Sequence, residues 1–175
     1  AAALAALASQ TGDSSYDLLG SRDLRGTPAA RHGIELALVD AEARSADVSL
    51  ASALSDGAPS ETVPVNATVG DGSVESTVRA TRDAIEGGYG AIKVKVGSRD
   101  PEEDAARLRA TREAAGEGVE LRADANGAWD RSTAEELLDV AAALDFAYVE
   151  QPLAADDLRG HAALRGRGVD IALDE

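Results

Sequence analysis

The stretch that decides the fold runs from Ala91 to Asp124, AIKVKVGSRDPEEDAARLRATREAAGEGVELRAD. It begins with a short β-type run, 91–96, and continues with a helical pattern that opens at Pro101. It closes with a second β-type run, 119–124. A strand, a helix and a strand in this order are typical of a βα repeat with parallel strands. The segment therefore predicts a parallel sheet covered by helices.

The same alternation fills the chain from about residue 62 onward. Strands are predicted at 63–69, 91–96, 119–124, 147–150 and 170–174, and helices at 73–87, 101–115, 132–144 and 156–165. Because each unit is short, successive strands should be parallel neighbours with right-handed crossovers. A closed barrel needs about eight strands and eight helices. The predicted fold class is therefore α/β, as an open five-stranded sheet or as the first half of a (β/α) barrel.

Residues 1–60 follow a different pattern. Pro28 opens a long helical stretch to about Arg44, and a second short helix is predicted at 48–55, with no strand between them. We expect the helical tail of another domain, joined by the linker DGAPSE at 56–61 to a domain at 61–175.

The composition excludes several classes of protein. The 175 residues have room for about one domain and carry a net charge of −15, whereas nucleic-acid binding needs a basic face. Without Cys there are no disulfides, thiolate zinc sites or cysteine nucleophiles, and two His residues are too few for a His-rich metal site. The longest apolar run, 1–8, is far shorter than the roughly 20 residues of a membrane span. No Met occurs, so we expect a processed chain or a piece of a longer protein.

The acidic charge itself favours an interpretation about habitat. Asp, Glu, Ala and Arg are abundant and Lys is almost absent. This composition is typical of halophilic proteins, which stay soluble at very high salt because salt screens their self-repulsion.

The only two lysines, Lys93 and Lys95, lie two residues apart on one predicted strand, whereas 15 arginines supply the other cations. Side chains alternate along a strand, so both lysines point to one face, while Ile92 and Val94 point to the other. A desolvated lysine can lose its proton and act as a base, which an arginine does not do. The pair is therefore a candidate for acid/base chemistry; chance survival in a Lys-poor composition is the alternative.

Acidic residues end the next three predicted strands. Asp124 is 26 residues before Glu150, and Glu150 is 24 residues before Asp174, which is one βα unit each time. Because neighbouring strands lie about 4.8 Å apart, the three carboxylates should converge on a volume that one small cation can fill. Oxygen ligands without His or Cys predict Mg²⁺, with Mn²⁺ as the usual substitute.

Each carboxylate taken alone also has a structural interpretation. Asp124 opens Asp-Ala-Asn-Gly, which is a good turn after a strand. Glu150 suits a polar strand end, and Asp174 lies next to the last residue, where side chains are often solvated. The common spacing, together with the lysine pair one strand earlier, favours the functional interpretation.

Four motifs on consecutive strands together resemble the muconate-cycloisomerase-like branch of the enolase superfamily. They are Lys93-Val-Lys95, Asp124-Ala-Asn126-Gly127, Glu150-Gln151-Pro152 and Asp174-Glu175. The resemblance begins at about residue 28, because PAARHGIELALVDAEA is similar to the end of that family's capping domain. It implies that 1–60 is the C-terminal helical part of a capping domain and that 61–175 is the first half of a modified (β/α)-barrel catalytic domain.

The resemblance also implies a chemistry: a proton is removed next to a carboxylate, and Mg²⁺ stabilises the enediolate that results. Asp124, Glu150 and Asp174 are the implied metal ligands, and Lys95 is the implied acid/base. Lys93 would lower the pKa of Lys95 and attract the substrate carboxylate. Asn126 and Arg122 would orient the substrate or the ligands. A second catalytic lysine would lie on a sixth strand, after residue 175.

Within the branch, VPVNAT at 63–68 and Arg122-Ala-Asp124 are most similar to o-succinylbenzoate synthases, lyases that dehydrate a cyclohexadiene carboxylate on the way to menaquinone. The close alternative is a dipeptide epimerase or an N-acylamino acid racemase, in which two lysines act on opposite faces of the substrate.

Two further classes stay open. One is a lyase that uses Lys95 as a Schiff-base nucleophile, and the other is an inactive, truncated barrel that serves as a binding module. The enzyme interpretation implies a cytoplasmic protein that binds a small-molecule carboxylate and neither nucleic acid nor membrane, and it is compatible with a homo-oligomer.

Overall fold

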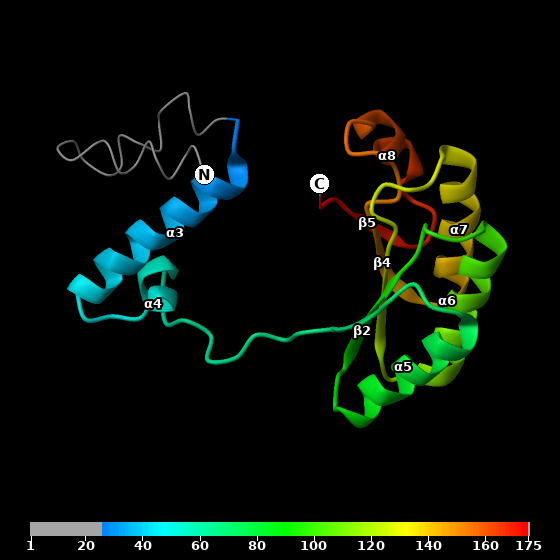
Figure 1. Ribbon diagram of the computed structural model, residues 1–175, viewed down its shortest axis with the longest axis horizontal. Coiled ribbons are helices and arrows are strands. Elements are labelled where there is room, and N and C mark those ends of the chain that lie inside the picture. Colours follow the sequence, from blue (N-terminus) through cyan, green and yellow to red (C-terminus); the bar gives the residue numbers. More distant parts are fainter. Residues whose placement is uncertain (1–25, 175) are drawn as a thin grey trace. The chain divides into compact units, whose positions relative to one another are not determined.

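The computed structural model describes residues 26–174, and the chain divides between Val63 and Pro64 into two compact units (Figure 1). The first unit contains α3, Pro28–Ser45, and α4, Leu50–Leu54. The long helix that opens at Pro28 is thereby confirmed. The short helix begins two residues later than predicted, because Ser49 caps it by accepting a hydrogen bond from the Ser52 amide. Residues 1–25 of the predicted capping-domain segment and Glu175 of the last motif lie outside the described residues.

The second unit alternates parallel strands with helices, as predicted. Its elements are β1 Ala67–Val69, α5 Val74–Glu86, β2 Ala91–Lys95, α6 Pro101–Ala115, β3 Glu120–Asp124, α7 Arg131–Ala143, β4 Phe146–Glu150, α8 Leu158–Leu164 and β5 Asp170–Ala172. The strands form one five-stranded sheet in the order β1-β2-β3-β4-β5, and each neighbouring pair is parallel. Sequential order of this kind is that of a partial (β/α) barrel.

The core lies between the sheet and the helices, which cover one face of it (Figure 1). Alternate strand residues, Ile92, Val94, Leu121, Ala123 and Val149, are fully buried there against Leu108 of α6 and Leu138 of α7. Lys93 and Lys95 occupy the intervening positions of β2 and are only partly buried. The predicted division into an apolar and a charged face is confirmed for β2 and β3. It is wrong for Ala147 of β4 and for Leu173 after β5, which were predicted on the packed apolar face and are exposed.

Several element ends differ from the prediction. Of the run 63–69, only 67–69 pairs with β2, and Val63 and Val65 are exposed. The last strand ends at Ala172, opposite the final residue of β4. Helix α7 begins at Arg131, one residue early, because Asp130 is the capping residue and accepts a hydrogen bond from the Thr133 amide. Helix α8 is shorter than 156–165, because Asp157 caps it in the same way at Gly160.

Within residues 26–174, no helix has both the length and the apolar character that crossing a membrane requires.

Candidate active site

The strand register sets the candidate site residues side by side. Lys95 pairs with Asp124 across β2 and β3, and Asp124 pairs with Glu150 across β3 and β4. All three residues end their strands, so they lie at the carboxyl edge of the parallel sheet, where functional groups of such folds are placed. Asp124 and Glu150 are buried, with 1% and 9% of their surface exposed.

Lys93 joins the two buried carboxylates. Its Nζ lies 3.2 Å from each oxygen of Glu150 and 3.3 Å from Oδ2 of Asp124. Lys93 can contact both carboxylates because it lies two residues before Lys95 and, by strand alternation, on the same face of β2. One ammonium therefore contacts carboxylates from two neighbouring strands.

Lys95 contacts Asp124 and Asn126. Its Nζ donates to Oδ2 of Asp124 at 2.6 Å and to Oδ1 of Asn126 at 2.8 Å. Asn126 reaches this position because the chain turns sharply after β3: its φ is 46°, that of Gly127 is 74°, and its amide donates to Oδ1 of Asp124 at 3.1 Å. The turn thus brings an amide oxygen next to the candidate base.

The charges at this edge reinforce one another. Burial alone would lower the pKa of Lys93, but its hydrogen bonds to Glu150 and Asp124 outweigh burial and raise that pKa. Burial likewise would raise the pKa of Asp124, but the hydrogen bonds from Lys95, the Asn126 amide and Lys93 lower it. Lys93 is therefore held as a cation and Asp124 as an anion.

Arg122 lies on the same face of β3, one step before Asp124. Its Nε donates to Glu120 at 2.7 Å and its Nη1 to Oδ1 of Asn66 at 3.2 Å, and its guanidinium lies 5.3 Å from the centre of the Tyr148 ring. The hydrogen bond to Glu120 is the main reason why the pKa of Arg122 is raised, although burial opposes it. The sequence pattern did not predict that Asn66 and Glu120 are the partners of Arg122.

Asp174 is placed differently from the other acids. It is exposed, and its backbone amide donates to Oε1 of Gln151 at 2.9 Å. Within residues 26–174, no three His, Cys, Asp or Glu side chains are grouped so that they could hold a metal ion, so Asp174 is not gathered with Asp124 and Glu150. The three-carboxylate site stays a prediction.

Gln151, for which no role was predicted from the sequence, also lies at this edge of the sheet. It is 1% exposed, and it has a φ of 42°. Its side chain accepts a hydrogen bond from the Asp174 amide and donates one to the Leu153 carbonyl at 3.0 Å. Its backbone N–H donates to the Ala172 carbonyl at 2.9 Å. The only indication of this role in the sequence is the position of Gln151 directly after Glu150. A buried side-chain amide at that position can form hydrogen bonds that join the ends of β4 and β5.

The donor set at Asp124 and Glu150 fits a hard divalent cation. Carboxylate oxygens are the preferred ligands of Mg²⁺ and Mn²⁺. Both side chains already contact one common cation, the Lys93 ammonium. These two residues would therefore hold a metal ion at the strand ends, where it would supply positive charge to a developing anion.

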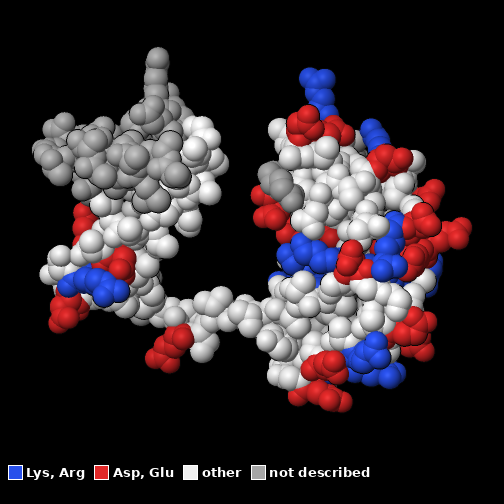
Figure 2. Space-filling view, in the orientation of Figure 1, with Lys and Arg blue, Asp and Glu red and all other residues white. Residues whose placement is uncertain are grey.

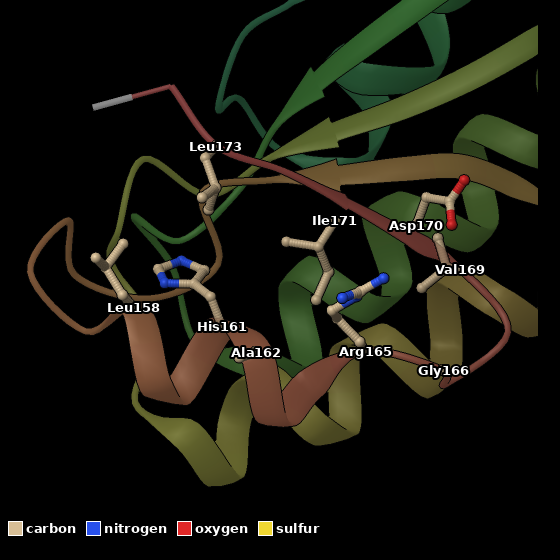
Figure 3. A pocket seen from close by; sticks show the side chains of 9 residues that line it. All are labelled: Leu158, His161, Ala162, Arg165, Gly166, Val169, Asp170, Ile171 and Leu173. Carbon is tan, nitrogen blue, oxygen red and sulfur yellow. The ribbon is translucent and has the colours of Figure 1, made fainter.

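Two cavities lie near the strand ends. One of about 340 Å³ is lined by Lys95 and Asn126 together with residues of the turns after β1 and β2, such as Asp71 and Ser98. A larger one of about 520 Å³ lies between α8 and the β5 segment, where His161 and Ile171 line it (Figure 3). This larger cavity includes none of the candidate site residues, so the smaller cavity is the one that gives access to Lys95.

Parallel βα units with amines and carboxylates at the carboxyl ends of their strands place this chain in the class of (β/α)-barrel proteins. The family model described as Enolase C-terminal domain-like matches residues 76–175. The chain therefore belongs to the enolase superfamily, in the branch of mandelate racemases and muconate-lactonizing proteins.

Similar proteins in this superfamily have different activities. An o-succinylbenzoate synthase of Thermobifida fusca is 42% identical over 66% of this chain and 36% of its own length. An N-succinylamino acid racemase of Thermus thermophilus is 39% identical over 86% of this chain and 40% of its own. The structure of a dipeptide epimerase from Enterococcus faecalis, complexed with Mg and the dipeptide L-Leu-L-Tyr, is 30% identical, with a TM-score of 0.78 over 84% of this chain and 41% of that one. The chain thus spans about two fifths of the proteins it matches.

Proposed function

We propose that this chain belongs to a Mg²⁺-dependent enzyme that removes a proton next to a carboxylate, most closely an o-succinylbenzoate synthase. The observation that carries the proposal is the contact of Lys95 Nζ with Asp124, beside a second lysine that joins two buried carboxylates. The family supports the reaction class, since its members named above act on carboxylate substrates or their derivatives. We also assign 1–60 to a capping domain and 61–175 to the first half of the barrel.

The two lysines have different roles in this proposal. Lys95, with 36% of its side chain exposed, takes the proton, since its Nζ borders the cavity at the strand ends. Lys93, with 20% exposed, stays charged and attracts the substrate carboxylate. Asn126, which accepts a hydrogen bond from Lys95, and Arg122, which lies over the Tyr148 ring, orient the substrate or the metal ligands.

Asp124, Glu150 and Asp174 are the proposed metal ligands. Mg²⁺ would supply the positive charge that stabilises an extra negative charge on the substrate carboxylate. Asp124 and Glu150 face a common cation in the structure, and Asp174 is tied by its main chain to the residue that follows Glu150.

The synthase activity is supported by the 42% identical relative and by the motifs at 63–68 and 122–124. A syn elimination can use Lys95 first as base and then as acid, so one lysine serves both steps. The alternative is a dipeptide epimerase or an N-acylamino acid racemase, supported by the 39% identical racemase and by the epimerase structure.

Substrate turnover in D₂O tests the proposal. The intact protein to which this chain belongs is incubated with Mg²⁺ and, in turn, with the cyclohexadiene carboxylate, an N-succinylamino acid and a dipeptide. Ultraviolet absorption follows the aromatic product of the first, and proton NMR follows loss of the α-proton signal of the other two. We expect Mg²⁺-dependent formation of the aromatic product. Exchange with an amino acid derivative instead would assign the alternative, and no reaction with any substrate would overturn the proposal.

Calorimetric titration with Mg²⁺ separates the enzyme from a binding module. Asp124→Asn and Glu150→Gln should each weaken Mg²⁺ binding by about tenfold or more, because each removes a charged ligand. Asp139→Asn and Glu135→Gln on α7 are the matched controls. They should leave Mg²⁺ binding unchanged, because both carboxylates lie on a helix, where they pair with Arg167 and not with the lysines of the candidate site. Unaltered binding in all four variants would favour the module, and borohydride trapping of substrate on Lys95 would indicate the Schiff-base lyase.

A further inference from the structure

Arg107 of α6 connects the ends of two strands from the helical face of the sheet. Its side chain is fully buried, at 0% exposure. Nη2 donates to the carbonyl of Gly70, the residue directly after β1, at 2.6 Å. Nη1 donates to the carbonyl of Lys95, the last residue of β2, at 2.8 Å, and Nε donates to Oγ1 of Thr77 at 3.1 Å. One guanidinium therefore fixes the main chain at both strand ends.

Asp104 extends this hold to the residues that follow Lys95. Its Oδ1 accepts from Nη1 of Arg107 at 3.0 Å, and its Oδ2 accepts from the amide of Gly97 at 2.7 Å. Gly97 has a φ of 93°, and a Cβ there would lie 2.9 Å from the carbonyl of Ala125. The loop after Lys95 is thus held against the turn that carries Asn126.

The chemistry of the pair suits a positional role. Taking two charges out of water is costly, and a buried ion pair is often no more stabilising than apolar residues of the same volume. Here the charges contact the backbone on both sides of Lys95, at 2.8 Å and 2.7 Å, where an apolar side chain could form no such bond. Beyond packing, the Arg107–Asp104 pair therefore fixes the main chain that carries Lys95, the candidate base.

We propose that Arg107, supported by Asp104, is a positioning residue that fixes the main chain of Lys95 and thereby aims the Lys95 amine at Asp124 and Asn126. The effect of Arg107 on catalysis rests on the proposed function of Lys95. The structural coupling between Arg107 and Lys95 is independent of that function. Neither Arg107 nor Asp104 touches the charged face of the sheet, so their effect passes through the backbone.

NMR of the 175-residue chain tests the coupling directly, because only two lysines give signals after labelling with ¹³C-lysine. The Hε–Cε signals are assigned with Lys93→Arg and Lys95→Arg. In Arg107→Met, the Lys95 signals should shift or broaden clearly more than those of Lys93. The control is Arg112→Met on the same helix, whose guanidinium also binds backbone carbonyls, those of Leu144, Gly116, Val119 and Asp145, but before β3 and β4. It should leave both lysines at their wild-type positions.

Kinetics of the intact protein to which this chain belongs supply the second measurement. Arg107→Met should lower kcat by on the order of 10- to 100-fold with KM within about twofold, because a misplaced base slows the chemical step more than binding. Arg112→Met should keep kcat within about threefold at the same loss of Tm. Where Arg107→Met does not fold, Arg107→Lys takes its place: it keeps the charge beside Asp104 but cannot reach both strand carbonyls at once.

The outcomes separate the two proposals. Lys95 signals unmoved in a folded Arg107 variant, or moved no more than in Arg112→Met, would overturn the positioning role. Selective movement of Lys95 together with loss of kcat would support it. Selective movement of the Lys95 signals, together with no turnover of any of the three substrates by the intact protein, would retain the coupling and overturn the proposed function.

Discussion

The Nζ of Lys95 lies 2.6 Å from Oδ2 of Asp124, at the ends of two paired parallel strands. This contact joins the proposed base to a proposed metal ligand, while Lys93 contacts the same oxygen at 3.3 Å. Both lysines therefore contact Asp124, but their other neighbours differ. Lys95 lines a cavity and contacts Asn126, whereas Lys93 contacts Glu150.

Arginine substitutions should separate the roles of the two lysines. Lys95→Arg keeps a cation beside Asp124 but stays protonated, so we expect kcat to fall by on the order of 100-fold or more. Lys93→Arg keeps the charge that its role requires, so we expect it to retain a larger share of activity. Steady-state kinetics measures both, with Tm as the control for folding. Similar activity in Lys95→Arg and wild type would contradict the role of Lys95 as base.

Removing Gln151 should release the segment that carries Asp174. Gln151→Met keeps the side-chain volume but removes the bonds to the Asp174 amide and the Leu153 carbonyl. Leaving such groups without a partner costs about 1–3 kcal/mol. Hydrogen exchange followed by NMR should show faster exchange of the Asp174 amide, while exchange of the core amide of Val94 should change only as far as the loss of global stability requires. Unchanged protection of Asp174 would show that other contacts hold this segment.

The N-terminus of α7 should make stability depend on pH. The hydrogen bond from the Thr133 amide is the main reason why the pKa of Asp130 is lowered in the folded protein. A lowered folded pKa stabilises the protein above the unfolded pKa of about 3.9, and this contribution is lost as pH falls through the folded pKa. Asp130→Ser keeps a neutral cap at every pH.

We therefore expect wild type to have the higher Tm at pH 7, where ionised Asp130 also interacts favourably with the helix dipole, and to lose this advantage over Asp130→Ser below about pH 4. Thermal unfolding of both proteins from pH 7 to pH 2 measures the difference. A Tm difference that is constant over this range would contradict the assignment of Asp130 as a charged cap.

Periodicity predicted the parallel sheet and the charged face, because strand alternation records burial residue by residue, as at Ile92, Lys93 and Val94. It could not predict the buried position of Arg107, because the helical pattern of an arginine-rich chain does not distinguish a buried guanidinium from a solvated one. The roles of Gln151 and Asn66 depend on partners 23 and 56 residues away, Asp174 and Arg122, and such pairings leave no local pattern. Strand ends were missed for a similar reason, since pairing with the neighbouring strand sets them.

Salt should stabilise this protein strongly. The net charge is −15, and Figure 2 shows acidic side chains spread over the surface of both units in this view. At low salt these charges repel one another in the compact state, whereas at 1 M salt the screening length falls to about 3 Å. We expect Tm and the free energy of unfolding to rise from 0.1 M (about 10 Å screening) to multimolar KCl. Equal stability at both extremes would rule out the halophilic interpretation, because a surface adapted to high salt gains stability when its self-repulsion is screened.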